Sequence, residues 1–332
     1  MKKKKVSYEK IFKTPINTKL IIMIADKDIS FVVQGPITSL TKKTTASIRF
    51  YYPQGTIIIS TWKNSNLEDL DYDSVILSED PGGVDAKVSG GTTNTLRQII
   101  STFEGLKKCN TEYVVKIRSD MIFYGKNLPL YYEKFNNLKR NSKIFFSRVL
   151  ILENGTLNPR GLYEMPYHFG DWFYFGKTND IKKIFDIDFS KKEELENAFY
   201  WKNREFPKNN INKKYYMRYR TETIHTYFHI KKKIKNILLH SNDVSSDNIK
   251  QSEFHLVNDY LLASMSSIQL KNAKHTNTSN LSSWVRYSSK EWMLLHKIFF
   301  IKEKKFINQI LYFFIYKSKY IVSLFLYYKK FL

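Results

Sequence analysis

Only one cysteine, Cys109, occurs among the 332 residues. A single thiol excludes an intrachain disulfide and any zinc site built from several cysteines. This usage fits a protein kept in a reducing cytoplasm. Acidic residues are also scarce, because 31 carboxylates stand against 54 lysines and arginines and leave a formal net charge of +23. Such an excess favours polyanionic partners, namely nucleic acid, anionic lipid or phosphorylated substrates, without selecting one of them.

Glycine and proline, the strong chain breakers, are missing from the last third of the chain. No glycine follows Gly176 and no proline follows Pro207. We therefore expect the region beyond them to be mainly helical, with helices over residues 221–233 and 258–270.

Long uninterrupted apolar runs are lacking too. The stretch at residues 20–25 is too short for the apolar segment of a signal peptide. The longest candidate for a bilayer span, residues 307–328, carries Lys317 and Lys319 near its middle, where charge is costly. The sequence therefore predicts a cytoplasmic protein.

The first third of the chain alternates strand and helix patterns. Short apolar runs at residues 29–33, 56–60 and 73–77 are bounded by glycine or proline and predict strands. Residues 41–52 have apolar side chains at helical spacing and predict a helix between the first two strands. This order is typical of βαβ units. The sequence thus predicts an α/β fold with a mostly parallel central sheet flanked by helices.

The apolar run at residues 113–117 predicts a strand buried on both faces. It ends abruptly in Arg118 and, two residues later, Asp120. In open α/β sheets, ligands bind just beyond the carboxyl ends of the strands, so these side chains are candidates for a site. Further strands are expected at residues 143–148 and 171–176.

A helix is predicted over residues 92–107, after a glycine-rich loop at 82–91. One side of this helix is apolar, and the other has short polar or small residues and no lysine: Asn94, Arg97, Gln98, Ser101 and Gly105. In a lysine-rich chain, such a face suits close approach of a ligand or of another chain segment. For Arg97, a salt bridge to a surface acid is the alternative.

Together these motifs resemble those of the WavE family of lipopolysaccharide-synthesis proteins. The resemblance extends from about residue 29 to residue 295. It rests on five short motifs whose order and spacing are fairly specific: Gln34-Gly35-Pro36, Asn94-Thr95-Leu96-Arg97-Gln98, Lys116-Ile117-Arg118-Ser119-Asp120, Asp171-Trp172 with Phe175-Gly176, and Glu222 in Arg220-Thr221-Glu222.

The resemblance implies a GT-A-like glycosyltransferase. Such an enzyme would move a sugar from a nucleotide-sugar donor onto lipopolysaccharide, lipooligosaccharide or a related surface glycan. It implies neither the sugar nor the linkage. The expected organisation is a basic N-terminal leader with an edge strand (residues 1–28), a GT-A-like domain with a helical C-terminal part (29–295), and a basic aromatic tail (296–332).

GT-A enzymes usually place an Asp-x-Asp motif after a central strand, where it holds a divalent metal against the donor diphosphate. Here the motif reads Arg118-Ser119-Asp120, so a cation replaces the first acid. Oxygen ligands suit Mg²⁺ or Mn²⁺, and the resemblance implies Asp120 as the metal ligand. In the alternative, Lys116 or Arg118 meets the diphosphate directly, because cationic side chains pair with phosphate oxygens.

The remaining site residues follow from their places in the resemblance. Gln34 and Gly35 would cradle the nucleotide base. The rest of the donor-binding set comprises Asn94, Arg97, Gln98, Lys116, Arg118 and Asp120. An inverting transfer also needs a general base to take the proton of the acceptor hydroxyl. Glu222 is the candidate for this base, with Asp171 as the second choice.

Two functions outside glycosyl transfer stay open. A sugar nucleotidyltransferase shares the sheet type but would carry a basic, glycine-rich loop where this chain has residues 34–36. A basic nucleic-acid-binding protein would explain the charge, but no such partner is expected because no RNP, helix-turn-helix or zinc-finger pattern occurs. Glu222, His225 and His229 share one helix face, yet their order is not that of the usual His-Glu-x-x-His zinc motif.

The tail combines lysines with many aromatic and aliphatic residues. Aromatic rings favour the headgroup region of a membrane, and each lysine near an anionic surface adds about 1 kcal/mol of attraction. We therefore expect the tail to attach the protein peripherally to the cytoplasmic membrane, where a lipid-linked glycan acceptor would be made. The alternative is that residues 307–328 form a helix packed on the domain.

Overall fold

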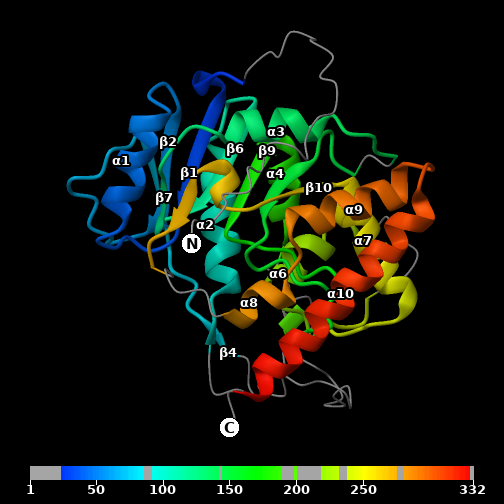
Figure 1. Cartoon of the computed structure of the whole chain (residues 1–332). Helices are drawn as coiled ribbons and strands as arrows, with labels where there is room; N and C mark the ends of the chain where they lie inside the picture. Colours follow the sequence, from blue (N-terminus) through cyan, green and yellow to red (C-terminus); the bar gives the residue numbers. More distant parts are fainter. Residues whose placement is uncertain are drawn as a thin grey trace, which may run out of the picture.

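The computed structural model describes residues 24–85, 92–141, 144–188, 198–199, 218–231, 238–274 and 280–329. Figure 1 shows a central sheet with helices on both sides and a group of helices at the C-terminal end. The strands are β1 (Ile29–Gln34), β2 (Thr56–Trp62), β3 (Ser74–Ser78), β4 (Val84–Asp85), β5 (Thr92–Thr93), β6 (Tyr113–Arg118), β7 (Met121–Phe123), β8 (Val149–Leu152), β9 (Phe173–Lys177), β10 (Tyr260–Ala263) and β11 (Leu270–Asn272). The helices are η2 (Asp26–Asp28), α1 (Thr41–Tyr51), α2 (Thr95–Lys107), α3 (Leu128–Asn136), α4 (Thr178–Phe185), α6 (Thr221–Tyr227), α7 (Ser246–Asn258), η4 (Ser266–Ile268), α8 (Asn280–Val285), α9 (Ser289–Phe300) and α10 (Lys305–Tyr328).

Seven strands form the main sheet in the order β10-β8-β9-β6-β1-β2-β3. Every strand pair is parallel except those that β9 makes with β6 and β8. The chain adds β2 and β3 on one side of β1 and then returns to place β6 on the other side. The reversal creates a crevice at the carboxyl ends of β1 and β6, which is where open α/β sheets bind ligands. The predicted α/β fold with a mostly parallel sheet is confirmed.

Consecutive residues of β1 point to opposite faces of the sheet, so its apolar side chains lie on both faces and each face is covered by a helix. Phe31 packs against Tyr52, which follows α1, and against Phe123 of β7. Val32 points the other way, toward α2. A Cβ added to Gly105 of α2 would lie 2.6 Å from the Val32 Cγ1 atom, so only glycine lets this helix approach so closely. The lysine-free face of the predicted helix therefore does not have one role along its whole length. Its C-terminal half, which contains Gly105, packs on the sheet.

Three predictions of secondary structure are wrong. Residues 144–147 form bends, and the strand expected at 143–148 begins only at Val149. Where a helix was expected over 258–270, β10 and β11 occur with η4 between them. All four residues of β10 are fully buried although it is the last strand at one edge of the sheet, because α7 and α9 pack against it. The helix predicted to start at residue 92 starts at Thr95, after the short strand β5.

Two other expectations concern parts of the chain that are described only in part. Helix α6 ends at Tyr227, and residues 232–233 of the predicted helix lie outside the described residues, as do residues 20–23 of the expected edge strand. The predicted loop at 82–91 contains β4, which pairs antiparallel with β5, while residues 86–91 lie outside the described part.

The C-terminal helices pack as a group beside the sheet. Figure 1 shows α10 lying along α8 and α9, and α9 in turn contacts α7 and β10. Helix α9 runs through residue 295, the expected end of the GT-A-like domain, so no break in secondary structure occurs there. The boundaries at residues 28 and 295 stay a prediction.

Candidate functional site

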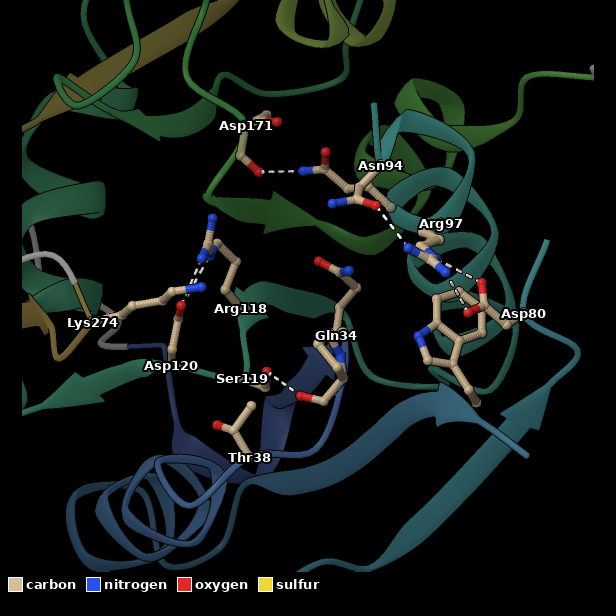
Figure 2. A pocket seen from close by; sticks show the side chains of 14 residues that line it. Gln34, Thr38, Asp80, Asn94, Arg97, Arg118, Ser119, Asp120, Asp171 and Lys274 are labelled. Carbon is tan, nitrogen blue, oxygen red and sulfur yellow. Dashed lines mark hydrogen bonds and ion pairs between the residues drawn. The ribbon is translucent and has the colours of Figure 1, made fainter. Parts of the chain in front are cut away.

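A cavity of about 450 Å³ opens at the carboxyl ends of the central strands (Figure 2). Its size is within the range of small-molecule binding sites. The turns after β1 and β6, the first turn of α2 and the segment before β9 supply predicted site residues: Gln34, Gly35, Asn94, Arg97, Gln98, Arg118, Asp120 and Asp171. The structure thus brings together eight residues that lie far apart in the sequence. Lys116 and Glu222 are not among the lining residues.

The turns after β1 and β6 are tied to each other. The backbone N–H of Ser119 donates to the carbonyl of Gln34 at 3.1 Å, and the Ser119 hydroxyl donates to the carbonyl of Pro36 at 2.8 Å. Gly35 adopts a φ of +118°, a conformation that favours glycine, and its N–H donates to the Ser60 carbonyl at 3.2 Å. This turn exposes backbone at the cavity wall without a side chain.

Asp120 is held by Arg118 in a bidentate ion pair. The Nε and Nη2 atoms of Arg118 lie 3.0 and 2.6 Å from the two carboxylate oxygens. The guanidinium also lies over the Trp172 ring, 5.2 Å from its centre. Burial disfavours the charge on Arg118, but the hydrogen bond and charge of Asp120 outweigh it and raise the pKa of Arg118. The pair is therefore a fixed, charged feature of the cavity.

Arg97 makes a second ion pair at the opposite side of the cavity. Its Nε and Nη2 atoms each donate to Asp80 at 2.7 Å, and Nη1 donates to Asn94 at 2.9 Å. Figure 2 shows the guanidinium directed toward Asp80 and away from the Asp120 turn. Arg97 thus lines the cavity as expected, but it makes the salt bridge to a partly exposed acid that was the alternative.

Asp171 lies between the polar wall of the cavity and the protein interior. Its backbone carbonyl accepts hydrogen bonds from Gln98 Nε2 at 3.1 Å and from Lys116 Nζ at 2.5 Å. Lys116 is completely buried behind this wall, and burial lowers the pKa of its ammonium to about 7. Gln98 therefore positions the cavity wall, while Lys116 supports it from the interior.

Glu222 lies in the first turn of α6, mostly buried, with its carboxylate Oε2 3.3 Å from His168 Nε2. Burial raises the pKa of Glu222, and the charge of Asp171 acts in the same direction, while His168 and Arg220 oppose the rise. Since His168 is only three residues from Asp171 in the chain, both candidate bases belong to one region. Thr95 and Thr221 join α2 to α6 there, with their hydroxyl oxygens 2.6 Å apart.

The donor atoms at the cavity suit a hard divalent cation. Asp120 and Asp171 both line it, and each oxygen of Asp120 keeps a lone pair beyond the one that Arg118 uses. Mg²⁺ and Mn²⁺ commonly use one or two carboxylates, waters and substrate phosphates, so no larger protein cluster is required. Among the described residues, no group of three or more histidine, cysteine or acidic side chains could hold a metal, including the face with His225 and His229.

Sequence reasoning missed two charged residues of the cavity, Asp80 and Lys274. Asp80 lies two residues after β3 and could have been found as an acid after a predicted strand. Lys274 lies two residues after β11, and it points toward the Asp120 turn in Figure 2. No local signal marks it among so many lysines.

A mostly parallel sheet with a polar cavity at the reversal between β1 and β6 defines a GT-A-like α/β protein. The model of the WavE lipopolysaccharide synthesis family matches residues 29–325, nearly the whole chain. The chain therefore belongs to the WavE family, and this assignment indicates a role in lipopolysaccharide synthesis. No curated protein matches the chain.

Proposed function

We propose that the protein is a glycosyltransferase that moves a sugar from a nucleotide-sugar donor onto lipopolysaccharide, lipooligosaccharide or a related glycan. The observation that carries this proposal is the place of the motif at residues 116–120. In a member of a lipopolysaccharide-synthesis family, it ends the central strand at the floor of a polar cavity large enough for part of a nucleotide sugar.

In this proposal the turn at Gln34 and Gly35 receives the nucleotide base, and the first turn of α2 contacts the donor through Asn94 and Gln98. Arg118 contributes a positive charge at the diphosphate. A divalent metal, when bound at Asp120, neutralises the charge that develops on the leaving nucleotide. Each of these groups stabilises the same event, departure of the diphosphate.

Glu222 acts as the general base in the inverting form of this reaction, and Asp171 is the second candidate. The acceptor O–H bond breaks and its proton passes to the carboxylate. The acceptor oxygen bonds to the anomeric carbon of the sugar. The bond from that carbon to the donor phosphate oxygen breaks, and its electron pair leaves with the diphosphate.

A panel of nucleotide sugars tests the proposal, with binding and hydrolysis measured with Mn²⁺, with Mg²⁺ and with excess chelator. We expect one donor or a narrow set of donors to bind and to be hydrolysed slowly without acceptor. Binding of none of them would refute the proposal. The ultraviolet absorbance of the purified protein is the companion measurement, since tightly bound nucleic acid would favour the nucleic-acid-binding alternative.

We also propose that α10 attaches the protein to the inner surface of the cytoplasmic membrane. By length and composition, α10 is the one helix in the described part of the chain that could cross a membrane. One side of it packs on α8 and α9, and the other is largely apolar and exposed, with Phe314, Ile321 and Phe325 each more than 60% exposed. Their spacing of seven and four residues places these three on one face.

The packed side of α10 includes polar contacts with buried acids, which argues for a helix lying in the plane of the membrane. The Tyr312 hydroxyl donates to Glu253 at 2.7 Å, and Lys319 Nζ donates to Glu291 at 2.5 Å. Both carboxylates are buried. Crossing the bilayer would leave them without these partners and bring Lys317 and Lys319 into hydrocarbon, at a cost of several kcal/mol. Lying at the surface, α10 keeps its packed side and buries only its apolar face.

A test of attachment must leave the packing of α9 and α10 intact. Truncation after residue 295 would cut α9 and expose buried Glu253 and Glu291. We therefore expect the triple variant Phe314→Ser, Ile321→Ser, Phe325→Ser to stay folded and to lose flotation with vesicles containing anionic lipid. The matched control replaces two exposed aromatics outside α10, Phe50 and Phe146, with serine and should float like wild type. Wild type that fails to float, or that resists both high salt and alkaline extraction, would contradict peripheral attachment.

A further inference from the structure

His168 contacts Glu222 in a way that fixes where its own protons are. The Nδ1 atom lies 2.9 Å from the carbonyl oxygen of Gly155. A carbonyl can only accept a hydrogen bond, so Nδ1 carries a proton. In a neutral imidazole, the other nitrogen, Nε2, is then a bare lone pair. The Nε2 atom lies 3.3 Å from Glu222 Oε2, within the distance of an ion pair.

An ionised carboxylate and a bare nitrogen lone pair would repel each other at this distance. The repulsion is removed when one of the two groups carries a further proton, either His168 as an imidazolium or Glu222 as a carboxylic acid. Glu222 and His168 therefore form a pair that holds one proton beyond the one on Nδ1. The other charged groups that act on Glu222 are Asp171 and Arg220.

The backbone around His168 is arranged to make this contact. Tyr167 has a φ of +60°, a conformation rare for a tyrosine, and its N–H donates to the Ser252 hydroxyl at 2.8 Å. The Thr226 hydroxyl bridges the two segments, donating to the Tyr167 carbonyl while lying 2.8 Å from the Glu222 carbonyl. Backbone strain of this kind persists only where the surroundings enforce it, and it is concentrated at functional sites. The orientation of His168 toward α6 is thus built in.

We propose that His168 is the positioning residue for the general base: it shares a proton with Glu222 and, as the imidazolium, keeps the Glu222 carboxylate ionised and ready to accept the acceptor's proton. This inference rests on the proposed glycosyl transfer and adds to it a residue that neither the family assignment nor the motifs supply. Without the imidazolium, a mostly buried carboxylate near Asp171 would hold its own proton to higher pH and be unable to act as a base.

The pair itself is tested without any assay of activity, by NMR of the full-length protein labelled with ¹⁵N in histidine. In wild type we expect the His168 signals of an imidazolium, protonated on both ring nitrogens. In Glu222→Gln the side-chain amide can donate to Nε2, so the signals should move to those of a neutral ring protonated on Nδ1. A neutral ring in wild type, or an imidazolium that is unchanged in Glu222→Gln, would overturn the proposal whatever the activity.

The role in catalysis is tested by the pH dependence of sugar transfer in His168→Gln and His168→Ala. Glutamine keeps a donor toward Glu222 but not the charge. Because a neighbouring cation lowers the pKa of a carboxyl by about 1–3 units, both variants should move the acidic limb of the profile toward higher pH, by about one unit at this partly exposed site. The matched control is His296→Gln, which alters a histidine that contacts only backbone carbonyl at its Nε2 (Lys139, 2.8 Å) and should leave the limb in place.

An unmoved acidic limb in both His168 variants, with the NMR pair present, would overturn the positioning role. Absence of turnover by wild type with every donor would instead refute the proposed function, and the catalytic role of His168 with it. The NMR result would still show whether the proton is shared, so the two failures are distinguishable.

Discussion

Replacing Asp120 with asparagine gives the sharpest test of the cavity. The change removes a charge from a bidentate pair in which the carboxylate is 9% exposed and the guanidinium 29% exposed. Breaking a fully buried pair costs about 3–5 kcal/mol, and an exposed pair contributes about 0–1 kcal/mol. The Asp120 pair lies between these limits, so we expect a loss of about 2 kcal/mol in the free energy of unfolding, measured by denaturant titration.

The effect on activity should be larger than the effect on stability. Loss of one preorganised electrostatic group typically lowers the rate by about 10²–10³-fold. The assay is transfer or hydrolysis with the donor identified from the panel, in saturating Mn²⁺ and in excess chelator. If Asp120 holds a metal, Asp120→Asn should lose most of the response to Mn²⁺, whereas Arg118→Gln should keep it.

A double-mutant cycle separates that role from simple support of Arg118. If Asp120 acts only by holding Arg118, the double variant should be no worse than the more impaired single variant, with a coupling of about 0.5–3 kcal/mol. The matched control, Asp80→Asn, breaks the more exposed Arg97 pair in the same cavity and should cost less than about 1 kcal/mol of stability. Full activity of Asp120→Asn in both Mn²⁺ and chelator would refute any role of Asp120 in donor binding.

Two further predictions concern the structure behind the cavity. Gly105→Ala should lower the free energy of unfolding by about 1–3 kcal/mol, because the added Cβ would lie 2.6 Å from Val32 and 2.9 Å from Ser60. An unchanged denaturation midpoint would mean that α2 does not pack this closely. Burial lowers the pKa of Lys116 to about 7, so between about pH 7 and 9 the unfolded chain binds a proton that the folded chain lacks. The free energy of unfolding of the wild type therefore increases with pH across that window. Lys116→Met should flatten this increase. Denaturation measured at several pH values checks this, and parallel wild-type and variant curves would show that Lys116 is charged when folded.

The sequence was sufficient to predict the part of the fold that rests on local pattern. Strands β1, β2 and β6 are short apolar runs with every interior position buried; glycine and proline mark the turn after β1 and the turn before β2, and β6 ends at the charged Arg118. The same reasoning failed at β10, which was read as helix because no glycine or proline interrupts the last part of the chain. Chain breakers report turns, whereas β10 is set by complete burial between α7, α9 and β8, a tertiary property.

The candidate site, too, was predictable only in part from the sequence. Residues that directly follow predicted strands, such as Gln34, Arg118 and Asp120, line the cavity as expected, because strand ends in a parallel sheet meet at one edge. Which charges pair was not predictable, since Arg97 reaches Asp80 and not the Asp120 turn. The contact of His168 with Glu222 joins segments 54 positions apart and depends on a backbone conformation that no local pattern announces.

The charges around the cavity bear on how a donor could bind there. Although the whole chain has a formal charge of +23, the lining residues are balanced: Arg97, Arg118 and Lys274 against Asp80, Asp120 and Asp171. Two of the three cations already have carboxylate partners. A diphosphate entering this cavity would meet Lys274 and two guanidinium groups that are already paired with acids. If the donor arrived with a divalent cation, both ion pairs could stay intact, and Asp120 is the residue that would hold that cation. The overall positive charge favours long-range attraction of anions, whereas binding inside the cavity depends on its local geometry.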